Sequence, residues 1–211
     1  MHDYFQQYLK AVTKPLPEMA EFFVKENNYL KNLITIDSSV LDVGCGNGRT
    51  MKFLAPYVRQ VIGVDYDFHM IDAAKQNLSS MGNIELRQED YLKNNYGKIF
   101  DLVYASYNLL GSAEVKPEQR KELLQKMISE TKTGGHTVAS VWSDKGIEFA
   151  KKYYPYIGIK FLSIEGNNVM TDQGIFKRFS QQELIDLAEP YSKNFKIIEL
   201  TGIFYLLDIV N

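Results

Sequence analysis

The sequence VLDVGCGNGRT, residues 40–50, runs from a short apolar segment into three alternating glycines. Short β-branched and apolar segments are typical of strands buried on both faces of a sheet. Glycine tolerates positive φ and lets a ligand approach the backbone, while the start of a following helix presents free N–H groups. Three glycines in five residues cost entropy without improving packing, so we expect a strand, a ligand-binding turn and a helix, in preference to a turn without a ligand.

The glycine spacing distinguishes two kinds of nucleotide site. Dinucleotide-binding proteins carry G-x-G-x-x-G/A, whose last small residue allows close packing of the helix on the strand. Gly44 and Gly46 fit that pattern, but Arg49 occupies the third position. The spacing here is G-x-G-x-G, ending at Gly48, and it disfavours an NAD-dependent oxidoreductase.

Strand-like and helix-like segments alternate from residue 40 to residue 142. Expected helices follow Asp67, a potential N-cap, and Pro117, a potential first-turn residue, with the second helix ending before Gly134 and Gly135. This alternation predicts βαβ units and a parallel sheet. The expected strands are residues 40–43, 61–64, 84–87, 100–104 and 137–142.

The two ends of the chain differ from this middle part. Apolar residues between Met19 and Leu33 predict an amphipathic helix before the first strand. Ser180 and Glu183 fit a capping box that opens a late helix. Two strands, residues 196–200 and 203–210, should then form an antiparallel hairpin. Residues 143–179 are rich in aromatic residues and are interpreted as an insertion that could act as a substrate lid.

At this point the sequence resembles the class I S-adenosylmethionine-dependent methyltransferases. The resemblance rests on LDVGCGNG, on VIGVDYDFHM, on the acidic stretch ending in QEDYL and on the terminal hairpin. It implies an α/β, Rossmann-like three-layer sandwich whose mostly parallel seven-stranded sheet ends in an antiparallel hairpin, with an insertion after strand five. One domain would span residues 1–211: an N-terminal helical cover (1–35), a cofactor-binding core (36–142), a possible lid (143–179) and a C-terminal helix and hairpin (180–211).

The resemblance also implies the cofactor, S-adenosyl-L-methionine, and where it binds. Asp65 lies 19 residues after Gly46, where an acid can accept hydrogen bonds from both ribose hydroxyls. Asp42 is expected to accept from N–H groups of the glycine loop, whereas Arg49 and Thr50 are interpreted as helix-surface or local loop residues. The expected cofactor-binding residues are Asp42, Gly44, Cys45, Gly46, Gly48, Asp65, Tyr66, Met70, Asp90 and Tyr91. Glu89 is an alternative to Asp90 as the partner of the adenine amino group.

The acceptor should lie at the carboxyl end of strand four, because ligands bind there in α/β sheets. That segment lacks the [D/N]-P-P-[Y/F] motif of enzymes that methylate base amino groups, and Asn108 could equally be a helix cap. The expected acceptor contacts are Ser106, Tyr107, Asn108 and, from the insertion, Tyr154. No catalytic dyad and no metal-ligand spacing are recognisable, so no catalytic residue and no metal are assigned.

The composition of the chain disfavours some binding partners and compartments. The chain has 211 residues, one cysteine and a net charge of -2, so no internal disulfide is expected and nucleic acid is a disfavoured partner. No signal peptide or membrane-length apolar run is recognisable, which predicts a cytoplasmic protein without a membrane partner. Nothing indicates an oligomeric state. We therefore expect a methyltransferase acting on a small molecule; the alternatives are an RNA- or protein-modifying methyltransferase and a cofactor-binding protein without turnover.

Overall fold

A computed structural model describes residues 2–211, with side chains from Phe5 onward. Seven strands form the main sheet in the order β3-β2-β1-β4-β5-β10-β9. The first five pair in parallel, and β10 runs antiparallel to both β5 and β9. This confirms the predicted mostly parallel sheet with a terminal antiparallel hairpin. The strands are β1 (Ser39–Val43), β2 (Gln60–Asp65), β3 (Ile84–Gln88), β4 (Phe100–Ala105), β5 (Thr131–Trp142), β9 (Phe195–Thr201) and β10 (Phe204–Val210).

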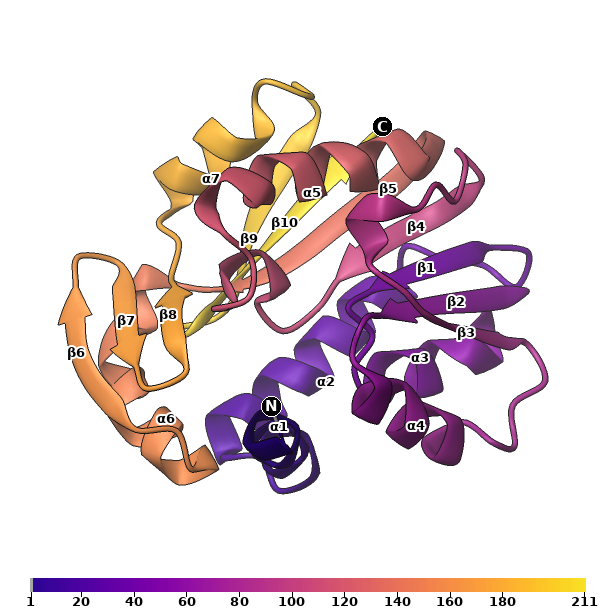
Figure 1. The fold of residues 1–211 in the computed structure, drawn as a ribbon. Helices are drawn as coiled ribbons and strands as arrows, with labels where there is room; N and C mark the ends of the chain where they lie inside the picture. Colours follow the sequence, from indigo (N-terminus) through magenta and orange to yellow (C-terminus); the bar gives the residue numbers. More distant parts are fainter. Residues whose placement is uncertain (1) are drawn as a thin grey trace.

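Helices cover both faces of this sheet and complete three layers (Figure 1). One face packs against α2 (Pro17–Lys31), α3 (Arg49–Leu54) and α4 (Phe68–Asn77), and the other against α5 (Pro117–Glu130) and α7 (Gln181–Ala188). Each helix buries one apolar stripe: Phe22 of α2, for example, stacks on Phe204 of β10 with ring centres 3.6 Å apart. The strands are therefore buried on both sides, as their continuous apolar runs predicted.

The insertion after β5 forms a separate layer. It contains the 3-10 helix η4 (Asp144–Phe149), α6 (Ala150–Ile157) and a three-stranded antiparallel sheet of β6 (Phe161–Glu165), β7 (Asn168–Thr171) and β8 (Gly174–Lys177). The N-terminal helix α1 (His2–Thr13) lies against α6 (Figure 1), where Gln7 donates to the Gly158 carbonyl at 3.1 Å. The first and sixth helices therefore meet at the end of the sheet where β5 finishes.

Capping residues in the sequence correctly indicated where several helices begin. Asp67 caps α4 by accepting from the His69 N–H at 2.7 Å, and Ser180 with Glu183 forms the predicted capping box of α7. Helix α5 ends at Glu130, before Gly134 and Gly135 as expected. The two glycines lie inside β5, which starts at Thr131 instead of residue 137, and the register against β4 shifts there. Shorter 3-10 segments are η1 (Ala55–Tyr57), η2 (Tyr91–Lys93) and η3 (Leu109–Gly111). Among the described residues, no helix has the length and apolar character needed to cross a membrane.

Candidate functional site

The glycine loop turns sharply between β1 and α3. Gly44, Gly46 and Gly48 have φ of 69°, 53° and 74°, a region that side chains other than glycine rarely adopt. The Gly44 and Cys45 N–H groups donate to the Val64 carbonyl, which fixes the loop to the end of β2. At Gly46 a Cβ atom would overlap the Tyr8 hydroxyl, so α1 reaches directly over the loop.

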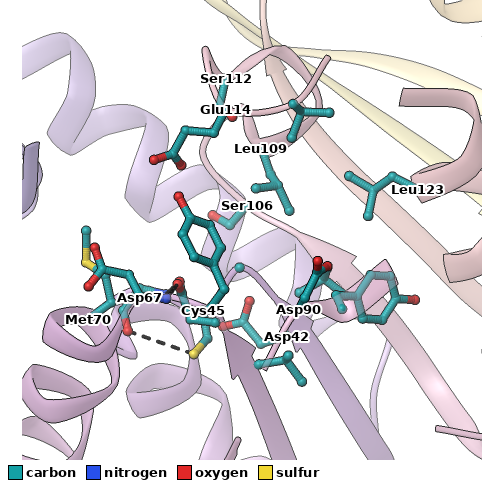
Figure 2. A pocket seen from close by; sticks show the side chains of 18 of the residues that line it. Asp42, Cys45, Asp67, Met70, Asp90, Ser106, Leu109, Ser112, Glu114 and Leu123 are labelled. Atoms are coloured by element: carbon teal, nitrogen blue, oxygen red, sulfur yellow. Dashed lines mark hydrogen bonds between the residues drawn. The ribbon is translucent and has the colours of Figure 1, made fainter. Parts of the chain in front are cut away.

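A pocket of about 500 Å³ opens beside this loop, at the carboxyl ends of β1, β2 and β4. This volume is typical of sites for small molecules and cofactors. Figure 2 shows Asp42 and Cys45 at one side of the pocket, with Ser106, Leu109 and Ser112 across from Met70. The predicted residues that line it are Asp42, Gly44, Cys45, Gly46, Asp65, Tyr66, Met70, Asp90, Tyr91, Ser106 and Tyr107.

Asp65 holds the glycine loop in place. Its Oδ2 accepts from the Gly46 N–H at 2.9 Å, and its Oδ1 accepts from the Asp67 N–H at 3.0 Å. Burial raises the pKa of Asp65 to about 6, against the lowering effect of these two hydrogen bonds. Each carboxylate oxygen can still accept another bond. The sequence interpretation had assigned the contact with the loop N–H groups to Asp42; that assignment was wrong.

Asp42 is a buried carboxyl group with one free oxygen. The residue is 2% exposed, and its Oδ2 accepts from the Tyr104 hydroxyl at 2.6 Å. Its Oδ1 has no hydrogen-bond partner in the described part of the chain. Burial is the main reason that its pKa rises to about 7, and the Tyr104 hydroxyl opposes this rise. Because a buried unpaired oxygen is costly, Asp42 is suited to a cationic or donor group of a ligand in the pocket.

The remaining lining of the pocket includes apolar, aromatic and acidic side chains. Met70 is buried and Tyr66 is half exposed, and both line it. Asp90 accepts from the Leu92 N–H at 3.1 Å and pairs with Lys93 at 2.9 Å. The Tyr91 hydroxyl is already engaged, because it donates to the Glu130 carboxylate at 2.7 Å. Tyr91 can therefore offer a ligand its ring but not its hydroxyl hydrogen.

Two residues of the GCGNGR turn have roles that the sequence did not reveal. Gly48 does not line the pocket; a Cβ there would collide with Leu78 of the segment after α4, so this glycine permits close packing. Arg49 is not a local surface residue. Its Nη2 lies 2.8 Å from the Glu26 carboxylate and 3.1 Å from the Ser106 Oγ, which joins α3 to α2 and β4.

The segment after β4 carries the expected acceptor residues, but only some face the pocket. Tyr107 and Asn108 both have positive φ, 57° and 66°. Asn108 was expected to project toward the acceptor; instead it is 2% exposed, its Oδ1 accepts from the Trp142 N–H at 3.0 Å, and it does not line the main pocket. Asn108 therefore holds the end of β5, because its left-handed backbone turns its amide toward that strand.

Tyr154 is likewise outside the main pocket. It is 1% exposed and packs on Phe176 of β8 with ring centres 5.0 Å apart. It lines a second, smaller cavity next to the first. Tyr8, Tyr107 and Ser112 line both spaces. The expected acceptor residues are thus divided: Ser106 and Tyr107 border the main pocket, while Asn108 and Tyr154 lie behind it.

Several pocket residues were missing from the sequence prediction. Tyr8 donates to Asn47 Oδ1 at 3.3 Å, and Glu114 interacts with the Tyr66 hydroxyl, whose pKa burial and this acid both raise. Glu26 does not line the pocket, but its carboxylate accepts hydrogen bonds from Arg49 and Ser106, which do. None of them belongs to a short motif, so no pattern within the sequence indicated them. Across the described residues, no group of three or more His, Cys, Asp or Glu side chains could hold a metal ion.

Sequence comparison gives matches over this same core. Residues 40–135 match a family model described as a methyltransferase domain. A methyltransferase by name, protein 235L of Invertebrate iridescent virus 6, is 31% identical over 90 residues, 41% of this chain and 33% of that protein. A ribosomal RNA small subunit methyltransferase A by name, from Methanopyrus kandleri, is 27% identical over 85 residues, 38% of this chain and 31% of that protein. The chain thus aligns with about a third of the length of each relative.

Structural comparison covers nearly the whole chain. The DhpI complex with SAM and HEP superposes with a TM-score of 0.71 and 18% identity, over 98% of this chain and 94% of that one. The sheet order and the glycine loop define a Rossmann-like α/β domain with its pocket at the carboxyl ends of the strands. Residues 40–135 thus match a methyltransferase domain, and the fold around them is similar to that of S-adenosylmethionine-dependent methyltransferases of known structure.

Proposed function

We propose that this protein binds S-adenosylmethionine in the main pocket and transfers its methyl group to a small molecule. The observation that carries the proposal is the arrangement of two carboxyl groups around the glycine loop. Asp42 has an unpartnered oxygen at one end of the pocket, and Asp65 closes the loop from the end of β2. The ammonium group of the methionine part would pair with Asp42, and the ribose hydroxyls would donate to Asp65.

The remaining pocket residues fit the same ligand. The backbone of Gly44 and Gly46 allows a close approach that any Cβ atom would prevent. Met70 and Tyr66 offer apolar surface for a base, and Asp90 or Glu89 could accept from its amino group. These residues would hold the cofactor along the carboxyl ends of β1, β2 and β3, with its methyl group directed toward Tyr107.

The reaction needs little from the protein beyond positioning. When bound, the cofactor supplies an activated methyl group: an acceptor lone pair forms the new bond to carbon, the carbon–sulfur bond breaks, and its electrons return to sulfur. The residues of this chain orient the two reactants and exclude water. Tyr8 and Tyr107, whose ring centres are 6.0 Å apart, line the pocket beside the proposed position of the methyl group, where their rings would exclude water. An acceptor N–H or O–H would release its proton to solvent or to a base.

A small acceptor is favoured by what surrounds the pocket. Helix α1 reaches over the glycine loop through Tyr8, and the insertion closes the neighbouring side. The net charge of -2 gives no general attraction for a phosphate backbone. The similarity to a protein named as a ribosomal RNA methyltransferase makes RNA the second candidate, and the test below therefore includes both.

Calorimetry with S-adenosylmethionine, S-adenosylhomocysteine and NAD tests the cofactor. We expect both sulfur compounds to bind and NAD to bind more weakly or not at all, because Arg49 stands at the third position of the dinucleotide pattern. Tighter binding of NAD would contradict the proposal. Incubation with pooled metabolites or with RNA, followed by measurement of S-adenosylhomocysteine release, then tests the acceptor; release with RNA alone would contradict the small-molecule assignment.

A further inference from the structure

A second cavity of about 40 Å³ lies directly behind the main pocket. Tyr8, Tyr107 and Ser112 form the partition, because they line both spaces. The far wall comes from α6 and β8 of the insertion, including Tyr154 and Phe176. A volume of this size holds roughly three water molecules, at about 10–15 Å³ each, or one carboxylate or phosphoryl group. The cavity is therefore an extension of the site on the side where the acceptor is proposed to enter.

Unpartnered polar atoms are concentrated around this cavity. The hydroxyls of Ser112 and Tyr154 and the amide oxygen of Gln7 are buried and have no hydrogen-bond partner within residues 5–211. Buried polar groups are nearly always paired in native proteins, since each unpaired one costs about 1–3 kcal/mol. Two of these three groups can donate a hydrogen bond. Their clustering in one small space indicates that a polar ligand group completes them.

Arg178 does not itself line this cavity but lies behind Trp142 and Tyr154, which do, and it has no acidic partner among the described residues. It is 0% exposed, and the only hydrogen bond of its side chain among the described residues runs from Nη1 to the Gly146 carbonyl at 3.1 Å. Its guanidinium carbon is 4.5 Å from the centre of the Trp142 ring, and Trp142 lines the cavity. Arg178 directly follows β8, which ends at Lys177. A buried cation without a counter-charge is costly unless an anion accompanies it.

The free side of Arg178 has the geometry that oxyanions recognise. Its Nε and Nη2 atoms both lack partners, and together they form the edge of the guanidinium group that binds a carboxylate or phosphate with two parallel hydrogen bonds. Burial lowers the pKa of Arg178 to about 10, so the group remains charged at neutral pH, and its charge also acts on the Tyr154 hydroxyl. The bidentate edge and the phenol would then share one anion.

We propose that Arg178 and Tyr154 bind the anionic end of the methyl acceptor, which is a small molecule carrying a carboxylate or phosphoryl group. This inference rests on the proposed function, because the main pocket would hold the methyl donor on the other side of Tyr107. The rings of Tyr8 and Tyr107 must turn to admit the acceptor, since they separate the two spaces. The acceptor would then extend from Arg178 toward the methyl group.

The single tryptophan of the chain offers a direct readout. Trp142 lies under Arg178, so its fluorescence should respond when an anion enters. We would titrate the S-adenosylhomocysteine-saturated protein with acetate, with inorganic phosphate and with acetamide, at constant ionic strength. We expect a saturable change with acetate or phosphate and none with acetamide, which has the shape of acetate without its charge. A saturable response to only one of the two anions would assign the carboxylate or the phosphoryl class.

Substitutions identify the residues. Arg178→Gln should weaken anion binding at least tenfold, Arg178→Lys less, and Tyr154→Phe severalfold. Arg120→Gln is the matched control, because Arg120 of α5 also has an unpartnered buried Nε but lines neither cavity, so anion binding should be unchanged in this variant. If Arg178→Gln does not fold, the acetate–acetamide comparison in the wild type and the Tyr154→Phe titration decide the question.

Two results would overturn the anion site: no saturable response to either anion, or equal affinity in the wild type and in folded Arg178→Gln and Tyr154→Phe. Calorimetry of S-adenosylhomocysteine on the same preparations separates the two proposals. Donor binding without an anion response contradicts the anion site alone. An anion response without donor binding contradicts the proposed function and leaves the anion site supported.

Discussion

At the scale of single residues, Asp42 and Asp65 differ because their surroundings differ. Asp65 accepts two backbone hydrogen bonds, whereas Asp42 accepts one from a tyrosine hydroxyl and leaves one oxygen unpaired. Burial raises both pKa values, to about 6 and about 7. Asp65 is thus part of the loop structure as well as a proposed ligand contact, while the free oxygen of Asp42 is the atom proposed to meet a ligand.

Substitution of Asp65 tests the ribose contact. Asp65→Asn should weaken S-adenosylhomocysteine binding by about 1.5–3 kcal/mol, the usual range for hydrogen bonds to a charged group, as measured by calorimetry. Asp72→Asn on the exposed side of α4 is the control and should bind normally, since Asp72 accepts a hydrogen bond from Gln76 and does not line the pocket. Normal affinity in a folded Asp65→Asn protein would remove this residue from the cofactor site.

The raised pKa of Asp42 predicts a pH dependence. Below pH 7 the free protein holds Asp42 protonated, so binding of an ammonium group must release that proton, and affinity should fall by up to about tenfold per pH unit. Above pH 7 the affinity should level off. Calorimetry of S-adenosylhomocysteine between pH 5.5 and 8.5 would measure this, with Asp42→Asn binding more weakly and with a flatter profile. Identical pH profiles for the wild type and the variant would contradict the assignment.

At the scale of helices and strands, the buried carboxylate of Glu26 in α2 forms hydrogen bonds with residues in or next to three other elements. Glu26 of α2 is 1% exposed and accepts from Arg49 of α3, from Ser106 at the end of β4 and from Ser140 of β5, at 2.5 to 2.8 Å. Such a group resembles a buried ion pair, which is costly to break because the remaining charge stays unpaired. Glu26 therefore fixes the position of the N-terminal helices relative to the glycine loop.

Removal of this acid should destabilise the protein strongly. Glu26→Ala should lower the free energy of unfolding by about 3–5 kcal/mol, because Arg49 and two hydroxyls lose their acceptor. Glu21→Ala on the same helix removes only an exposed pair with Lys25 and should cost less than about 1 kcal/mol. Urea unfolding of both variants provides the comparison. Equal losses would show that the Glu26 cluster does not hold α2 in place.

At the scale of the whole molecule, the pocket joins parts that are distant in the chain. Its lining comes from α1, the glycine loop, the ends of β2 and β4, and the segment before α5 (Figures 1 and 2). A ligand that touches all of them should stabilise the complete fold. At about 100 times its dissociation constant, S-adenosylhomocysteine should add about 2.7 kcal/mol, which raises Tm by roughly 5–10 °C in a domain of this size. NAD at the same concentration should leave Tm unchanged; a comparable shift with NAD would contradict the cofactor assignment.

Signals confined to a few neighbouring residues were sufficient to predict much of this structure. The glycine loop, the strand runs, the Asp67 cap and the Ser180 capping box all depend on local backbone geometry and on side-chain periodicity, so the sequence could indicate them directly. The sheet with its antiparallel end followed from the alternation of elements and from the family resemblance. The early start of β5, at Thr131, was missed because Gly134 and Gly135 serve a shift in strand register, which depends on the neighbouring strand.

Only the tertiary structure decided which side chains meet across the site. Glu26 and Ser140 are 114 residues apart, and Asn108 reaches Trp142 instead of the pocket because a left-handed backbone turns it that way. Arg178 lies on Trp142 only because the insertion folds back against the end of β5. Such contacts depend on how whole elements pack, and packing is fixed by burial across the molecule. The sequence by itself therefore determined the class of the fold and the position of its glycine loop, and tertiary packing determined the groups that face a ligand.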